Sequence, residues 1–144
     1  MIPQYAGFWR RFVAAVIDTL ILELATWLIQ ATLAVALKAF GQVMNPFMLQ
    51  VLGVVIYLIL SAIYFVWGQF RYGTTFGKRV FRIYVVQMAD KSSSMTLRQA
   101  WLRYFGYFVS YATLGAGFLM VGTHPQKRGL HDLIAGTVSV IKNQ

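Results

Sequence analysis

Two charged side chains interrupt the apolar segment GFWRRFVAAVIDTLIL near the start of the chain. Arg11 and Asp18 are seven residues apart, which places them about 20° apart around an α-helix and about 10 Å apart along it. Ala14 and Ala15 lie between them, and such small residues let a neighbouring helix approach closely. A charge inside an apolar helix costs roughly 2.5–3.5 kcal/mol on insertion. Asp18 is therefore expected either to line a path for a solute or to meet a partner from another segment.

Two further acidic residues are candidates for a functional role. Glu23 lies deeper in the same apolar segment, about 140° around the helix from Asp18. It could face an oligomer interface or a cavity, or it could be protonated. Asp132 follows His131 near the end of the chain, and the composition of that segment favours a solvated pair at the membrane surface. The residues alone therefore leave Glu23 and Asp132 with several alternatives.

Other kinds of chemistry find little support in the sequence. The segment GTTFGKR differs from a phosphate-binding loop in its glycine spacing, and Arg79 stands where such a loop has Ser or Thr. Lys78 and Arg79 could still contact lipid phosphates, although an ordinary basic loop explains them equally well. His124 and His131 have no cluster of metal ligands around them, and the chain contains no cysteine. We therefore expect no metal, no cofactor and no enzyme activity.

The composition is typical of a membrane protein. Of the 144 residues, 58% are hydrophobic and only 12% are charged, against roughly 45–50% and about 25% in soluble domains. The length predicts one domain covering residues 1–144. The net charge of +9 could indicate nucleic acid, anionic lipid or cytoplasmic loops, so the positions of the basic residues must decide between them.

Two segments are long and apolar enough to cross a bilayer, at about residues 12–37 and 47–67. The connection between them holds only Lys38, whereas the stretch after the second segment holds seven basic residues, namely Arg71, Lys78, Arg79, Arg82, Lys91, Arg98 and Arg103. The positive-inside rule then places this loop and the N-terminus in the cytoplasm. Most of the positive charge is explained by topology, and we expect no nucleic-acid partner.

The rest of the chain predicts shorter elements. The segment RVFRIYVVQM is rich in β-branched and aromatic residues and predicts a short strand-like piece. Thr96 is a candidate N-cap for a helix that leads into a third apolar segment at residues 104–122. That segment either spans the membrane once or breaks at TLGAGF and re-enters, and we slightly favour re-entry because it keeps the basic tail inside. The closing GLHDLIAGTVSVIKN predicts a short interfacial helix followed by an extended piece. The predicted fold is an all-α polytopic membrane protein.

Several of these segments together resemble the RDD family of small integral membrane proteins. The segments YAGFWRRFVAAVID, GTTFGKRVFRIYVV, LRQAWLRYFGYF, LGAGFLMVG and KRGLHDLIAGTVSV carry the resemblance, which covers essentially the whole chain. The family is named for one arginine and two aspartates. Position by position, these match Arg11, Asp18 and Asp132.

The resemblance implies that Arg11, Asp18 and Asp132 form a buried cluster, for which the closing segment must fold back on the first helix. Such a triad would carry one net negative charge and could attract a cation or proton. The resemblance therefore implies a protein that transports a cation, proton or other small solute. The alternatives are a non-transporting scaffold, a partner-binding protein or a lipid-binding protein.

The expected partners are the bilayer and its anionic lipids, together with a second copy of the chain or another membrane protein. The expected location is the inner membrane of a bacterium, with the N-terminus in the cytoplasm.

Overall fold

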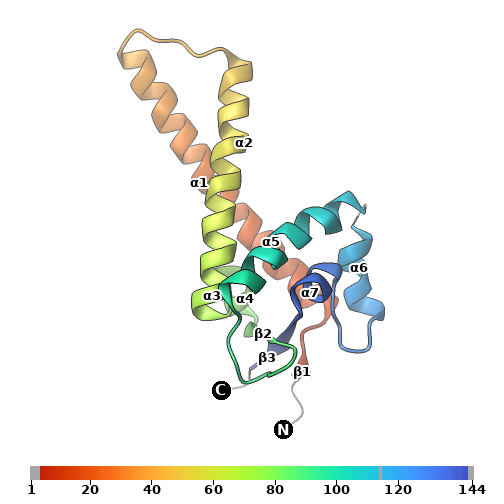
Figure 1. Ribbon diagram of the computed structural model, residues 1–144. Helices are drawn as coiled ribbons and strands as arrows, with labels where there is room; N and C mark the ends of the chain where they lie inside the picture. The colour runs from red at the N-terminus through yellow and green to blue at the C-terminus, as the bar shows by residue number, and fades with distance from the viewer. Residues whose placement is uncertain (1–3, 114, 143–144) are drawn as a thin grey trace.

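The structure is a computed structural model that describes residues 4–113 and 115–142. Most of the described chain is helical, and Figure 1 shows a long helical hairpin with the short elements gathered at one end, beside both termini. In chain order the elements are β1 (Gln4–Tyr5), α1 (Phe8–Ala39), α2 (Pro46–Ala62), the π-helical turn η1 (Ile63–Trp67), α3 (Gly68–Tyr72), α4 (Phe76–Val80), β2 (Ile83–Gln87), α5 (Leu97–Ala112), α6 (Ala116–Thr123), α7 (Leu130–Ala135) and β3 (Thr137–Ile141).

The hairpin consists of the two predicted membrane spans. Helix α1 and the continuous helix Pro46–Tyr72 are both long and apolar enough to cross a membrane, which confirms the two predicted spans. The second helix begins where the Asn45-Pro46 turn was expected. The Asn45 side chain accepts a hydrogen bond from the backbone N–H of Phe47 at 2.9 Å, and Pro46 occupies the first turn. At 32 residues α1 is about 48 Å long, so it extends beyond a hydrocarbon core of about 30 Å.

The third apolar segment turns back on itself. Thr96 caps α5 as predicted, and Gln99 completes a reciprocal capping box with it. Helices α5 and α6 are bent by 102° at the predicted break, where Gly115 has a positive φ of 81°; Leu114 lies outside the described residues. A single crossing would carry the end of the chain away from its start, whereas β3 pairs with β1. The described chain therefore returns to the side on which it began (Figure 1).

A small antiparallel sheet closes this end of the molecule. Its strand order is β1-β3-β2, and Ile141 lies opposite both Gln4 and Ile83. Strand β2 lies in the segment predicted to be strand-like, and α7 followed by β3 matches the predicted short helix and extended end. Pairing of β1 with β3 was not predicted, because the two strands are at opposite ends of the sequence. The predicted all-α fold class did not include this small sheet.

We call the sheet together with α4 and α7 the cap. Val85, Val138 and Val140 are buried within it, and Ala14 of α1 is buried where the lower part of that helix meets the cap. Helix α5 packs against α7, and α4 packs against α1. The cap therefore surrounds the lower end of α1, where the charged residues lie.

Candidate functional site

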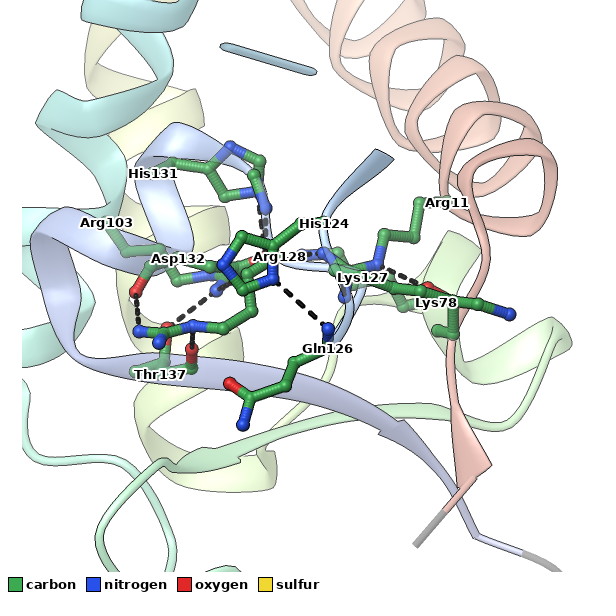
Figure 2. A network of polar contacts seen from close by, with 12 residues as sticks. Arg11, Lys78, Arg103, His124, Gln126, Lys127, Arg128, His131, Asp132 and Thr137 are labelled. Atoms are coloured by element: carbon green, nitrogen blue, oxygen red, sulfur yellow. Dashed lines mark hydrogen bonds and ion pairs between the residues drawn. The ribbon is translucent and has the colours of Figure 1, made fainter. Parts of the chain in front are cut away.

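Asp132 joins three helices through its carboxylate. It lies in the first turn of α7 and is completely buried. Its Oδ2 atom is paired with the Nη1 atom of Arg11 on α1, and its Oδ1 atom with the Nη1 atom of Arg103 on α5. The backbone N–H of Gly129 also donates to Oδ2, at 3.1 Å. Figure 2 shows these side chains converging, and we call Arg11, Arg103 and Asp132 the Asp132 cluster.

Local structure explains why Asp132 reaches this position. Gly129 is the N-cap of α7 and cannot supply a side chain, so Asp132 at the third helical position turns back to its N–H. A glycine on the facing helix lets α5 approach closely. A Cβ atom at Gly106 would lie only 2.8 Å from the Cα atom of His131. The close approach brings Arg103 within reach of Asp132.

Backbone and hydroxyl acceptors hold the guanidinium groups in place. Arg11 donates from Nε to the carbonyl of Ala6 at 3.0 Å and from Nη2 to the carbonyl of Lys127 at 2.6 Å. Arg103 donates to the hydroxyl of Thr137 at 2.8 Å. These bonds connect the Asp132 cluster to segments beside β1 and to β3, and thus to both ends of the described chain.

A further arginine binds the backbone around the same cluster. Arg128 donates from Nε to the carbonyl of Thr137 at 3.2 Å and from Nη2 to the carbonyl of Asp132 at 3.3 Å. Figure 2 shows Arg128 beside Asp132, between α7 and β3. The end of the chain is therefore held by side chains that approach it from several directions.

The electrostatics of the cluster favour an ionised Asp132. Burial by itself raises the pKa of Asp132, but the guanidinium groups of Arg103 and Arg11 outweigh this effect and hold the pKa well below its usual value. The pKa of the neighbouring His131 is lowered to about 3, mainly because the side chain is buried. The negative charge of Asp132 raises this pKa, but the positive charges of Arg103 and Arg11 lower it further. The imidazole is therefore neutral near pH 7. With two guanidinium groups on one carboxylate, the Asp132 cluster carries one net positive charge rather than the expected net negative charge.

Asp18 lies in a different set of contacts. It is completely buried, and its Oδ1 atom accepts hydrogen bonds from the hydroxyl of Tyr64 at 2.6 Å and the backbone N–H of Gly77 at 2.7 Å. Its Oδ2 atom accepts from the hydroxyl of Thr75. No ion pair of Asp18 is present within residues 4–113 and 115–142. Asp18 is thus held by two hydroxyls and one amide.

The structure therefore brings together only part of the predicted triad. Arg11 and Asp132 are in direct contact, whereas Asp18 bonds to the end of the second span and to α4. The seven-residue separation explains the difference, because it places Asp18 about 10 Å farther along α1 than Arg11. At that height the partners of Asp18 come from the end of the second span, from Thr75 and from α4.

The remaining predicted residues are dispersed. Glu23 is exposed on α1 and makes no hydrogen bond or ion pair with any described residue. Arg79 is exposed on α4, as a lipid contact requires. Lys78 differs, because it is only 7% exposed and its ammonium group donates to the hydroxyl of Tyr107 at 3.2 Å. The helical turn of α4 directs Lys78 toward α5 instead of the membrane surface.

Sequence reasoning missed Arg103, Tyr64 and Thr75 as partners of the two aspartates. Arg103 was counted only as one of the basic residues that set the topology. Its helical neighbours Gly106 and Ser110 lie within about 60° of it, and all three are buried. An arginine within a stripe of small residues was a usable signal for a buried face. No comparable signal marked Tyr64 and Thr75, which reach Asp18 through tertiary packing.

Comparisons with known proteins identify the family of the chain. The model of the RDD family matches residues 5–136, a range that includes Arg11, Asp18 and Asp132. The chain is also 30% identical over 150 aligned positions to "Uncharacterized protein YxaI" of Bacillus subtilis (strain 168), with 95% of this chain and 97% of the relative covered. No solved structure matches the chain significantly. The family match and the two apolar spans lead to one conclusion: the chain is a small membrane protein that belongs to the RDD family.

Proposed function

We propose that the protein transports a proton or a small cation, and that Asp18 is the group that binds it. The observation that carries this proposal is the burial of Asp18 in a membrane-spanning helix without a basic partner among the described residues. Acidic groups inside membranes are costly and commonly mark ion or proton pathways. The family's second aspartate is a weaker candidate, because Asp132 is already neutralised by two guanidinium groups.

The donors around Asp18 suit such a role. A hydroxyl can donate a hydrogen bond to a carboxylate, and after rotation its oxygen can instead face a cation. Tyr64 and Thr75 both supply hydroxyls to Asp18. Carboxylate and hydroxyl oxygens are hard ligands that suit small cations. Both residues also line a pocket of about 380 Å³.

The proposed orientation places the cap and both termini in the cytoplasm of a bacterial cell. The basic loop after the second span lies on the cap side, whereas Lys38 is at the far end of α1. Such an asymmetry is the usual sign of the cytoplasmic side. The bacterial source of the relative supports an inner-membrane location.

A complete transport path would need a second copy of the chain, because two spans and one bent pair enclose little space. Glu23 supports a dimer interface on α1. An exposed carboxylate within an apolar span is costly in lipid, and polar groups of a second copy could surround it. The chain contains no cysteine, so single introduced cysteines can test this interface by cross-linking in native membranes. Trp27→Cys, about 40° from Glu23, should form dimers, whereas the exposed control Leu28→Cys, about 140° away, should not. Equal cross-linking at both positions would contradict the interface.

The transport proposal is tested by flux into proteoliposomes. We expect Asp18→Asn to abolish the dissipation of an imposed pH, Na⁺ or K⁺ gradient, while exposed Asp90→Asn leaves it unchanged. The unfolding temperature of each variant in detergent must be measured in parallel. Flux that persists in a folded Asp18→Asn protein would reject the role of Asp18.

A non-transporting scaffold is the competing function, and the Asp132 cluster is the observation that favours it. One carboxylate connects α1, α5 and α7 and thereby fixes the cap to the first span. A scaffold predicts that the wild-type protein dissipates none of the three gradients, although it folds and assembles. That result in fully reconstituted protein would favour the scaffold over transport.

A further inference from the structure

A second feature of the fold lies where the second span leaves the membrane. The pocket of about 380 Å³ beside Asp18 opens between the end of that span and α4. Its lining includes the apolar and aromatic side chains of Ile63, Trp67, Tyr72 and Phe76, together with Arg79. The wall is mostly apolar, which suits a hydrocarbon chain better than a polar solute.

The wall residues place the opening at the level of lipid headgroups. Ile63, Trp67, Tyr72 and Phe76 are each more than half exposed. Trp and Tyr concentrate at membrane–water interfaces, where their rings lie among the headgroups. Ile63 lies within the last turns of the apolar span, and Phe76 lies just beyond it. The pocket therefore extends from the hydrocarbon edge to the interface.

Arg79 supplies the charged group of the pocket lining. It is exposed, and its guanidinium group forms no hydrogen bond or ion pair with any residue in the described ranges. A guanidinium matches the geometry of a phosphate and can bind it with two parallel hydrogen bonds. The neighbouring Lys78 differs, because its ammonium group is already engaged with Tyr107. Arg79 is thus the free cation of the pair.

We propose that this pocket binds an anionic phospholipid from the leaflet that adjoins the cap. One acyl chain lies against Ile63, Trp67 and Phe76, and the headgroup phosphate lies on Arg79. The positive charge of Arg79 in the pocket lining favours a headgroup with net negative charge over a zwitterionic one. The occupant is a bilayer lipid, because the apolar wall is open at the depth where acyl chains are present. This site does not depend on the transport proposal.

Fluorescence quenching by brominated lipids tests the proposal directly. A protein in which Trp9, Trp27 and Trp101 are replaced by Phe retains Trp67, at the pocket wall, as its single tryptophan. It is reconstituted in vesicles that contain a small fraction of either brominated phosphatidylglycerol or brominated phosphatidylcholine. We expect phosphatidylglycerol to compete for the site about fivefold better, the factor that corresponds to roughly 1 kcal/mol for one cation near an anionic surface.

Two arginine variants test whether the preference for phosphatidylglycerol arises in the pocket. Arg79→Gln should remove the preference for phosphatidylglycerol, whereas Arg98→Gln, at an exposed arginine outside the pocket, should preserve it. Phe76→Ala should reduce quenching by both lipids. Circular dichroism of each variant must match that of the parent protein.

Three outcomes would overturn the proposal. Equal quenching by the two lipids would show ordinary annular contact. A preference that survives Arg79→Gln would place the anionic selectivity elsewhere. Unchanged quenching by both lipids in Phe76→Ala would place the acyl chains outside the pocket.

Discussion

Asp18 and Asp132 are both completely buried, yet their partners differ in kind. Asp132 is paired with two guanidinium groups, so its negative charge is overcompensated. Asp18 is surrounded by two hydroxyls and one amide, which donate hydrogen bonds without bringing a formal charge. Both sites lie at the lower end of α1, but one connects α1 to α7 and the other connects it to α4.

The difference predicts unequal losses of stability when each carboxylate is neutralised. Neutralising a carboxylate that balances two buried cations leaves those cations without compensation, which is strongly destabilising. Neutralising a carboxylate that only accepts hydrogen bonds removes a buried charge and keeps part of the bonding. Asp132 is therefore suited to hold the fold in one state, whereas replacing Asp18 by a neutral residue should cost less stability.

The largest predicted effect comes from Asp132→Asn. It should lower the free energy of unfolding by about 3–5 kcal/mol, because Arg11 and Arg103 then lack a counter-charge in a buried site. The measurement is thermal unfolding in detergent, with exposed Asp90→Asn as the control. Adding Arg103→Gln to the variant should recover part of the loss. A double variant less stable than Asp132→Asn would show that shape, rather than charge, dominates this site.

The second prediction concerns pH and His131. Unfolded histidine takes up a proton near pH 6.5, whereas folded His131 stays neutral down to about pH 3. Between these values the unfolded state binds more protons, so stability falls as the pH is lowered, by at most about 1.4 kcal/mol per pH unit. From pH 6 to pH 4 the expected loss is about 2–3 kcal/mol.

Variants at the two histidines assign this pH dependence. His131→Gln should flatten the decline between pH 6 and pH 4, and His124→Gln should leave it unchanged. Asp132 contributes little in this range, because its folded pKa is lowered and the pKa of an unfolded aspartate is about 3.9. An unchanged decline in His131→Gln would mean that another group controls the acid sensitivity.

The third prediction sharpens the description of the Asp18 site. A Cβ atom at Gly77 would overlap the carbonyl oxygen of Ala14 and lie 2.9 Å from the Oδ1 atom of Asp18. Gly77→Ala should therefore cost about 1–3 kcal/mol by forcing α4 away from α1. Gly122→Ala is the matched control, since no atom lies within 4 Å of its added Cβ and it should stabilise α6 by about 0.5–1 kcal/mol. Equal unfolding temperatures for the two variants would contradict the close α1–α4 contact.

The smallest predicted effect on stability is that of Asp18→Asn. The amide retains one acceptor oxygen for the donors around it, so the expected loss is about 1 kcal/mol. Thermal unfolding under the conditions used for Asp132→Asn gives a direct comparison. If the two variants lose equal stability, the distinction between the two aspartates fails and Asp18 is a structural residue as well.

Local patterns in the sequence were sufficient to predict the long helices and where they begin. The lengths of the apolar segments, the Asn45-Pro46 turn and the Thr96 cap each depend on neighbouring residues, and the structure has all of them. Contact between Arg11 and Asp132 followed from the family resemblance, because no local pattern relates residues so far apart. The break between α5 and α6 followed from the glycines around it.

Tertiary packing determined what the sequence did not reveal. Arg103 looked like one more basic residue of a cytoplasmic loop until α5 packed on α7 and buried it. Asp18 shares a face with Arg11, but rise along the helix gives the two residues different neighbours. Lys78 and Arg79 are adjacent, and only the direction of α4 decides that one is buried and the other exposed.

The pairing of the two chain ends has a consequence for biosynthesis. Gln4 pairs with Ile141, and 121 residues separate Arg11 from Asp132. At 5–20 residues per second a ribosome needs roughly 6–24 s to make that interval. During this time Arg11 must wait in or near the membrane without Asp132, whereas the partners of Asp18 are made within 59 residues of it. A chain that stops before Asp132 is made leaves Arg11 without this counter-charge.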